Sequence, residues 1–282
     1  MKTNLLFLAI LFSVISLNGL AQSSHSCCAK HSTAMFAMLG DDASFRASHL
    51  SPLPFNYISP AGKMISFKAA DGDMASAFEI RSKNPTNNYL FVIHEWWGLN
   101  DYIKQIAEKF QNEVGNVNVI ALDLYDGRIA TNSDEASKFM SETKEERIRA
   151  IINGALAYVG KDARIQTVGW CFGGGWSLQT SLMAGKQTAG CVMYYGMPET
   201  DEKKIQAISF PVLGFFASKD GWITPEIVNR FESEMKKYNK EITVKSFDAV
   251  HAFANPSNPK HDKAATEEAH AMAVSFLKKN LQ

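Results

Sequence analysis

Cysteine is scarce in this chain of 282 residues, which has only four. Cys27 and Cys28 are adjacent and could bond to each other only with strain. Cys191 lies in an apolar run typical of a buried strand, and Cys171 lies in a glycine-rich segment. This usage excludes a small scaffold held together by disulfides, and it leaves Cys171 in need of a chemical explanation.

An excess of charge of either sign is also lacking. Lys plus Arg number 29 and Asp plus Glu number 29, so the formal net charge is zero. The chain therefore has neither the basic footprint of a nucleic-acid-binding protein nor a polybasic membrane patch. We expect a small-molecule partner, no nucleic acid, no stable membrane anchor and a monomeric state.

Long apolar runs are limited to the N-terminus. Residues 1–4 carry a positive charge, residues 5–17 are apolar, and Gly19 and Ala21 supply small residues before a cleavage site. The apolar run is short for crossing a bilayer, although an uncleaved anchor is the alternative. The pattern predicts a signal peptide over residues 1–21 and export to the periplasm or the medium.

Residues 22–62 show no clear periodicity and contain several prolines, which predicts a linker or wrapping segment before one domain over residues 63–282. The segment begins with two thiols and two imidazoles, which are ligands of soft metals. Their spacing matches no standard zinc or haem pattern, so we expect no cofactor and keep these four only as weak metal candidates. They are His25, Cys27, Cys28 and His31.

Short apolar runs alternate with amphipathic segments over the rest of the chain. The expected strands are residues 64–67, 75–80, 89–93, 118–121, 164–168, 190–195, 210–217 and 242–247. The expected helices are residues 99–113, 133–139, 145–159, 176–183, 225–237 and 261–279. This alternation predicts a single α/β domain with a mainly parallel sheet and helices on both faces.

The segment Gly169–Gly173 fits the pattern glycine, any residue, nucleophile, any residue, glycine, with Cys171 as the nucleophile. A strand is expected before it and a helix after it, which together make a nucleophile elbow. Glycines allow the strained nucleophile's neighbours to approach closely. The helix N-terminus favours a thiolate, although a buried and inert cysteine is the alternative for the motif alone.

An acid and a base follow the elbow in the chain. Asp220 comes just after the strand expected at residues 210–217, and His251 follows the strand expected at residues 242–247. Alone, Asp220 could be a turn residue and His251 a surface histidine. Together with Cys171 they predict a triad, because active-site residues collect at the carboxyl ends of the strands in such sheets.

Five stretches in this order resemble the dienelactone hydrolase family, a branch of the α/β-hydrolase fold. They are Val92–Asp101, Ala121–Tyr125, Val168–Gly174, Ala217–Asp220 and His251–Phe253. The resemblance implies hydrolysis of an ester or lactone through Cys171, His251 and Asp220, without a cofactor.

The resemblance also implies roles for residues that spacing alone does not single out. Glu95 matches a family glutamate that lies beside the resting thiol and helps to activate it when substrate binds. A buried carboxylate there would raise the pKa of the thiol and keep it protonated until substrate displaces the carboxylate. The backbone N–H groups of Phe172 and Trp96 would form the oxyanion hole. His94, beside Glu95, is expected to be a structural neighbour. The remaining candidates would line the substrate pocket: Trp97, Trp170, Tyr125, Arg128 and Phe253.

One position departs from the family pattern. Dienelactone-cleaving members have a substrate-binding arginine four residues after the catalytic histidine, and Asn255 occupies that position here. A neutral amide binds a carboxylate less strongly than a guanidinium. We therefore expect an ester or lactone hydrolase of unknown preference. The alternatives are a broad carboxylesterase or acyl-transfer enzyme, a non-catalytic binding protein, and a metal-handling protein.

Overall fold

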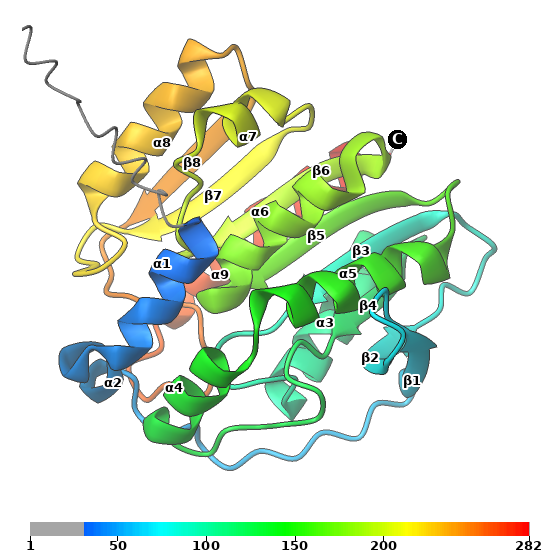
Figure 1. Ribbon diagram of the computed structural model, residues 1–282, viewed down its shortest axis with the longest axis horizontal. Coiled ribbons are helices and arrows are strands. Elements are labelled where there is room, and N and C mark those ends of the chain that lie inside the picture. The colour runs from blue at the N-terminus through cyan, green and yellow to red at the C-terminus, as the bar shows by residue number, and fades with distance from the viewer. Residues whose placement is uncertain (1–30, 282) are drawn as a thin grey trace, which may run out of the picture.

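The computed structural model describes residues 31–281. Its centre is an eight-stranded sheet in the order β1-β2-β4-β3-β5-β6-β7-β8 (Figure 1). The strands are β1 (Lys63–Lys68), β2 (Met74–Ile80), β3 (Asn88–Ile93), β4 (Asn118–Leu122), β5 (Arg164–Trp170), β6 (Thr188–Tyr194), β7 (Val212–Ala217) and β8 (Ile242–Phe247). β2 runs antiparallel to both β1 and β4, whereas all other neighbouring strands are parallel.

Helices cover both faces of the sheet. In Figure 1, α5 and α6 lie in front of the sheet, and α3 and α9 lie behind it, packed against each other. The helices are α1 (Ser32–Met38), α2 (Ala43–Ser48), α3 (Asp101–Val114), α4 (Ser133–Glu142), α5 (Glu145–Val159), α6 (Phe172–Ala184), α7 (Glu202–Ala207), α8 (Pro225–Lys237) and α9 (Lys263–Lys279). The predicted α/β architecture is confirmed.

The central strands are buried on both faces, which explains why they read as continuous apolar runs rather than as alternating patterns. Every residue of β4 and β7 is buried. The parallel strands β3, β5, β7 and β8 all end at the same edge of the sheet. The loops that follow these four strands carry Glu95, Cys171, Asp220 and His251, respectively.

The expected elements between residues 63 and 282 are present, and most of their bounds differ by only a few residues. The segment over residues 22–62, expected to be a linker or wrapping segment, contains α1 and α2. Neither of these helices was expected, and the short α7 was not expected either. These helices have six or seven residues, too few to be stable alone, so packing rather than local sequence holds them. Phe36 of α1 and Phe45 of α2 are completely or almost completely buried.

The proposed signal peptide over residues 1–21 lies outside the described residues, as do His25, Cys27 and Cys28. Within residues 31–281, no helix has the length and apolar character needed to cross a membrane. In the same range Cys171 and Cys191 are both free thiols, and both are buried.

Candidate active site

Cys171 lies at the turn between β5 and α6 and is the N-cap residue of that helix. Its backbone has φ 57° and ψ −120°, a conformation that costs energy for a residue with a side chain. A Cβ on Gly169 would overlap the carbonyl oxygen of Gly173, and a Cβ on Gly173 would overlap the carbonyl oxygens of Ile93 and His94. The two glycines of the motif are therefore required for α6 to approach β3 and β5 this closely.

His251 and Asp220 form a buried pair beside the elbow. Nδ1 of His251 lies 2.6 Å from Oδ2 of Asp220. The other carboxylate oxygen of Asp220 accepts hydrogen bonds from the backbone N–H groups of Trp222 (2.9 Å) and Ile223 (3.0 Å). Burial opposes ionisation of this carboxyl, but His251 and these hydrogen bonds outweigh it and lower the pKa of Asp220. Asp220 is therefore ionised and holds the imidazole with its proton on Nδ1.

The other ring nitrogen of His251 is left free. Its Nε2 atom is buried and has no hydrogen-bond partner among the described residues. A ring nitrogen of His251 and the Sγ atom of Cys171 lie within 4.8 Å of each other. With Nδ1–H donating to Asp220, Nε2 carries the free lone pair that a general base needs. The structure thus brings together the three residues that the chain order predicted as a triad.

Two backbone donors surround the sulfur. The N–H groups of Phe172 and Trp96 both hydrogen-bond to the Cys171 side chain and so act to lower its pKa. Phe172 is the first residue of α6, and Trp96 follows β3. These are the two amides that the family resemblance implied for an oxyanion hole, and they converge on the same atom.

The resting thiol is nevertheless protonated. Burial raises the pKa of Cys171 well above its usual value of 9.0, and the Glu95 carboxyl raises it further, which outweighs the two amides. Only 1% of the cysteine is exposed, so the loss of hydration makes the largest contribution to the pKa of the thiol. The expectation that the helix N-terminus favours a thiolate therefore does not describe the resting state.

Glu95 is buried and held by two neutral donors. The Tyr195 hydroxyl donates to Oε1 (3.2 Å), and the Asn255 side-chain amide donates to Oε2. Burial raises the pKa of Glu95 to about 8 despite these hydrogen bonds. Asn255 Oδ1 accepts two hydrogen bonds from Ser257, which turns the amide N–H₂ group toward Glu95. Asn255, at the position of the family's arginine, thus holds the Glu95 side chain in place but brings no positive charge to it.

His94 has a structural role, as expected. The Leu124 backbone N–H donates to its Nε2 atom (3.1 Å), so the proton lies on Nδ1, which is 2.5 Å from the Glu95 carbonyl oxygen. Both ring nitrogens are occupied, and burial lowers the pKa of this histidine. His94 therefore ties the loop after β3 to the loop after β4.

The five residues expected to line the substrate pocket lie in different surroundings. Trp97 and Phe253 are buried in the core, packed against Trp96 and Tyr195 respectively. Tyr125 lies near enough to Cys171 to influence it electrostatically, and its hydroxyl has no partner among the described residues. Arg128 donates to Glu142 and Thr143 instead of lining the cavity described below. Only Trp170 of this group lines that cavity.

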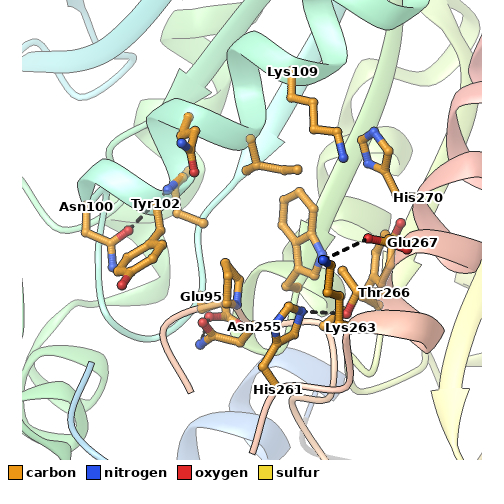
Figure 2. Close-up of a pocket in the computed structure, with 17 residues that line it drawn as sticks. Glu95, Asn100, Tyr102, Lys109, Asn255, His261, Lys263, Thr266, Glu267 and His270 are labelled. Atoms are coloured by element: carbon orange, nitrogen blue, oxygen red, sulfur yellow. Dashed lines mark hydrogen bonds and ion pairs between the residues drawn. The ribbon is translucent and has the colours of Figure 1, made fainter. Parts of the chain in front are cut away.

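A cavity of about 270 Å³ lies between α3 and the segment from Ala254 to His270 (Figure 2). Glu95, Asn255 and Trp170 are among its lining residues, but Cys171 and His251 are not. Glu95 lines this space and also interacts electrostatically with Cys171. Figure 2 shows Glu95 and Asn255 next to each other at one side of the cavity.

On the other side, helices α1 and α2 cover the triad. The rings of Phe36 and Phe45 lie 6.5 Å and 5.8 Å from the His251 ring, measured between centroids. His49 follows α2, and its ring lies 5.3 Å from that of His251. Sequence reasoning did not identify His49, because nothing in its local sequence links it to residues more than a hundred positions away. It likewise missed Tyr195, which had appeared only as the end of a strand.

The chain is similar to proteins of a known family. The model of the dienelactone hydrolase family matches residues 76–281. The chain is 29% identical over 206 residues to "Protein usf" of Aquifex pyrophilus, covering 68% of this chain and 88% of the relative. It is 24% identical over 201 residues to "Carboxymethylenebutenolidase 1" of Cupriavidus pinatubonensis, covering 66% and 83%.

A solved structure of the esterase Pf2001 from Pyrococcus furiosus has the same fold. The TM-score is 0.61 at 14% identity, over 81% of this chain and 98% of the esterase. The family match covers every strand from β3 onward and all the triad residues. The chain therefore belongs to the dienelactone hydrolase family, has the α/β-hydrolase fold, and is a hydrolase that acts on ester or lactone bonds.

Proposed function

We propose that this protein cleaves an ester or enol-lactone through a covalent thioester on Cys171. In the first half-reaction, His251 Nε2 removes the proton of the thiol and the sulfur attacks the acyl carbon. The resulting oxyanion accepts hydrogen bonds from the N–H groups of Phe172 and Trp96, which contribute about 2.7–4 kcal/mol each to such a transition state. Collapse expels the alcohol or enol, which takes the proton from His251.

In the second half-reaction, water replaces the leaving group. His251 Nε2 removes a proton from the water as it attacks the thioester carbonyl, and the same two amides stabilise the second oxyanion. Collapse breaks the C–S bond, returns the proton to the thiolate sulfur and releases the carboxylic acid. Asp220 stays ionised throughout and stabilises the imidazolium that forms in each half-reaction.

One observation carries this proposal. His251 has one ring nitrogen fixed by Asp220 and the other buried and unpartnered among the described residues, and a nitrogen of this ring lies within 4.8 Å of the Cys171 sulfur. Burying an imine nitrogen without a partner costs free energy. An arrangement that retains this cost at a strained cysteine is typical of a catalytic site rather than of a structural one.

The resting thiol is protonated, so activation must come with the substrate. A substrate in the cavity would meet Glu95 first. Where Glu95 is ionised, its displacement by the substrate would remove its contribution to the raised pKa of Cys171, and proton transfer to His251 would become easier. This role fits the glutamate implied by the family resemblance.

The substrate preference is left open by the site. Asn255 offers no positive charge, so a free carboxylate on the substrate is not required. A broad carboxylesterase or acyl-transfer enzyme therefore remains the second candidate, and a binding protein without turnover is the non-enzymatic alternative.

The test is a panel of esters and lactones, including p-nitrophenyl acetate and a dienelactone, assayed with the wild type and Cys171→Ala. We expect turnover that iodoacetamide abolishes and that Cys171→Ala lacks. Cys191→Ala is the matched control, because Cys191 is a second buried thiol one strand away and should leave turnover intact. Equal turnover by wild type and Cys171→Ala would refute the mechanism, and no turnover on any substrate would favour the binding protein.

We also propose that the protein is exported and loses residues 1–21. The support is the sequence alone: a short basic start, an apolar stretch of suitable length and small residues before the cleavage site. Mass spectrometry of the protein from an exporting bacterial host should find a mature chain starting at Gln22 outside the cytoplasm. An intact Met1 in the cytoplasmic fraction would contradict this proposal.

A further inference from the structure

His49, Cys171 and His251 form a buried cluster of metal-ligating atoms. One nitrogen of each histidine and the cysteine sulfur lie within 4.8 Å of one another. Within residues 31–281 no other group of three or more histidine, cysteine or acidic side chains converges in this way. It is a different set from the N-terminal candidates, of which only His31 is described; that residue lies at the start of α1, 3.3 Å from Lys204.

Both imidazoles have their Nδ1 atom occupied, which leaves the Nε2 lone pair free. His49 Nδ1 lies 2.7 Å from the carbonyl oxygen of Phe45, and since a carbonyl can only accept, Nδ1 carries the proton. His251 Nδ1 donates to Asp220 in the same way. The Nε2 atoms of both histidines are buried and unpartnered among the described residues.

This arrangement is the one that metal-binding histidines adopt, with the second ring N–H donating to a carbonyl or a carboxylate. We propose that His49 Nε2, Cys171 Sγ and His251 Nε2 bind a divalent cation of the zinc type. Two imidazoles and one thiolate suit Zn²⁺, which binds nitrogen at about 2.0–2.1 Å and sulfur at about 2.3 Å. In tetrahedral geometry such ligands lie roughly 3.3–3.6 Å apart, so small side-chain rotations close the cluster around the ion.

The charges around the cluster balance those of the ion. The Cys171 thiolate supplies one negative charge, and ionised Asp220, one hydrogen bond away through His251, supplies a second. His49 keeps its Nε2 lone pair available, because its proton lies on Nδ1, next to the carbonyl oxygen of Phe45. Burying a dication is costly unless such anions accompany it.

Binding would proceed by exchange of a proton for the ion. The Cys171 S–H bond breaks, the proton goes to solvent, and the sulfur and two nitrogens donate their electron pairs to the cation. No electrons are transferred. If the proposed function is correct, the bound ion removes both the nucleophile and the base from catalysis, and a chelator restores them.

His49 comes from outside the region matched by the family model, which starts at residue 76. It is held in place by Phe45 and by a ring contact of 4.6 Å with Trp96. The third ligand is thus contributed by the segment that covers the triad, and an ion would fasten that segment to the domain.

The test uses the full-length chain with Cys27 and Cys28 both changed to serine, so that the N-terminal thiols cannot bind metal. Co²⁺ serves as a spectroscopic probe for a thiolate ligand, and Zn²⁺ affinity is measured by competition with a chromophoric chelator. We expect one ion per chain and a thiolate-to-Co²⁺ charge-transfer band. Cys171→Ser should lose the band. His49→Gln removes a ligand and should weaken Zn²⁺ binding by at least roughly 10–100-fold, which is the cost of losing only the hydrogen-bond partner of a ligand.

His270→Gln is the matched control, because His270 is also buried but pairs with Glu113 and should bind Zn²⁺ as before. Absence of stoichiometric binding, or binding unchanged by both Cys171→Ser and His49→Gln, would overturn the proposal. If His49→Gln does not fold, the Co²⁺ spectra with and without Cys171→Ser decide. Because these readouts need no turnover, failure of the hydrolase mechanism and failure of the metal site are distinguishable.

Discussion

Asp220 controls which nitrogen of His251 carries the proton. An asparagine at position 220 can still accept the two backbone hydrogen bonds, but its N–H₂ group would donate to Nδ1 and shift the proton to Nε2. For Asp220→Asn we therefore expect kcat on an ester substrate to fall by about 10⁴-fold, with little change in KM. Steady-state kinetics with p-nitrophenyl acetate measure this.

Thermal unfolding of the same variant provides the control. A midpoint close to that of the wild type would show that the loss is in proton placement rather than in folding. An Asp220→Asn enzyme with more than a tenth of the wild-type kcat would mean that the aspartate does not orient the base.

The sequence predicted the identity of the triad because the residues after successive strands follow a fixed order in this fold. The family resemblance implied that Glu95 keeps the resting thiol protonated, and the structure adds that burial is the larger cause and that two amides oppose it. The sequence could not predict the partners of Glu95. Tyr195 is 100 positions away and Asn255 is 160, and only the loop geometry brings their donors to the two carboxylate oxygens.

At the scale of elements, the contact between α6 and β3 can be tested at its glycines. A Cβ at Gly173 would overlap the carbonyl oxygens of Ile93 and His94, whereas a Cβ at Gly175 would lie 3.4 Å from the nearest atom, Met197 O. We expect Gly173→Ala to lower the free energy of unfolding by about 1–3 kcal/mol, because the helix must move away from the strand. Urea denaturation measures the loss.

Gly175→Ala is the matched control in the same helix. Because alanine is favoured over glycine inside a helix, its unfolding free energy should be unchanged or higher by up to about 1 kcal/mol. Equal effects of the two substitutions would mean that helix propensity, and not the approach of α6 to β3, decides the outcome.

The long elements were predictable, and α1 and α2 were not, for the same physical reason. The apolar runs of β4 and β7 and the amphipathic pattern of α3 and α8 carry enough local signal to specify their structure. Helices of six or seven residues carry too little, and they form here because Phe36 and Phe45 bury their rings over the triad.

At the scale of the whole molecule, Glu95 links folding stability to pH. Burial raises its pKa from 4.5 to about 8, so the folded protein holds a proton that the unfolded chain releases between these values. The wild type should therefore lose stability as the pH rises from about 4.5 to about 8, by a few kcal/mol, since one pKa unit corresponds to about 1.4 kcal/mol.

Glu95→Gln removes this contribution. Denaturant unfolding at pH 5, 6, 7 and 8 should give a difference between variant and wild type that moves in favour of the variant as the pH rises. Other titrating groups are shared and cancel in the difference. A difference that does not vary with pH would mean that the carboxyl ionises as easily in the folded protein as in the unfolded chain.

The sequence by itself determined the layered α/β sheet, the order of nucleophile, acid and base, and the glycines at the elbow. These features depend on local periodicity and on steric rules that hold wherever the chain lies in space. The tertiary structure alone decided that burial is the main cause of the raised pKa of the thiol, that Asn255 and Tyr195 hold Glu95, and that His49 reaches the triad. Each of these features depends on burial and on contacts between residues that are distant in the sequence. No short stretch of the sequence specifies such burial or such contacts.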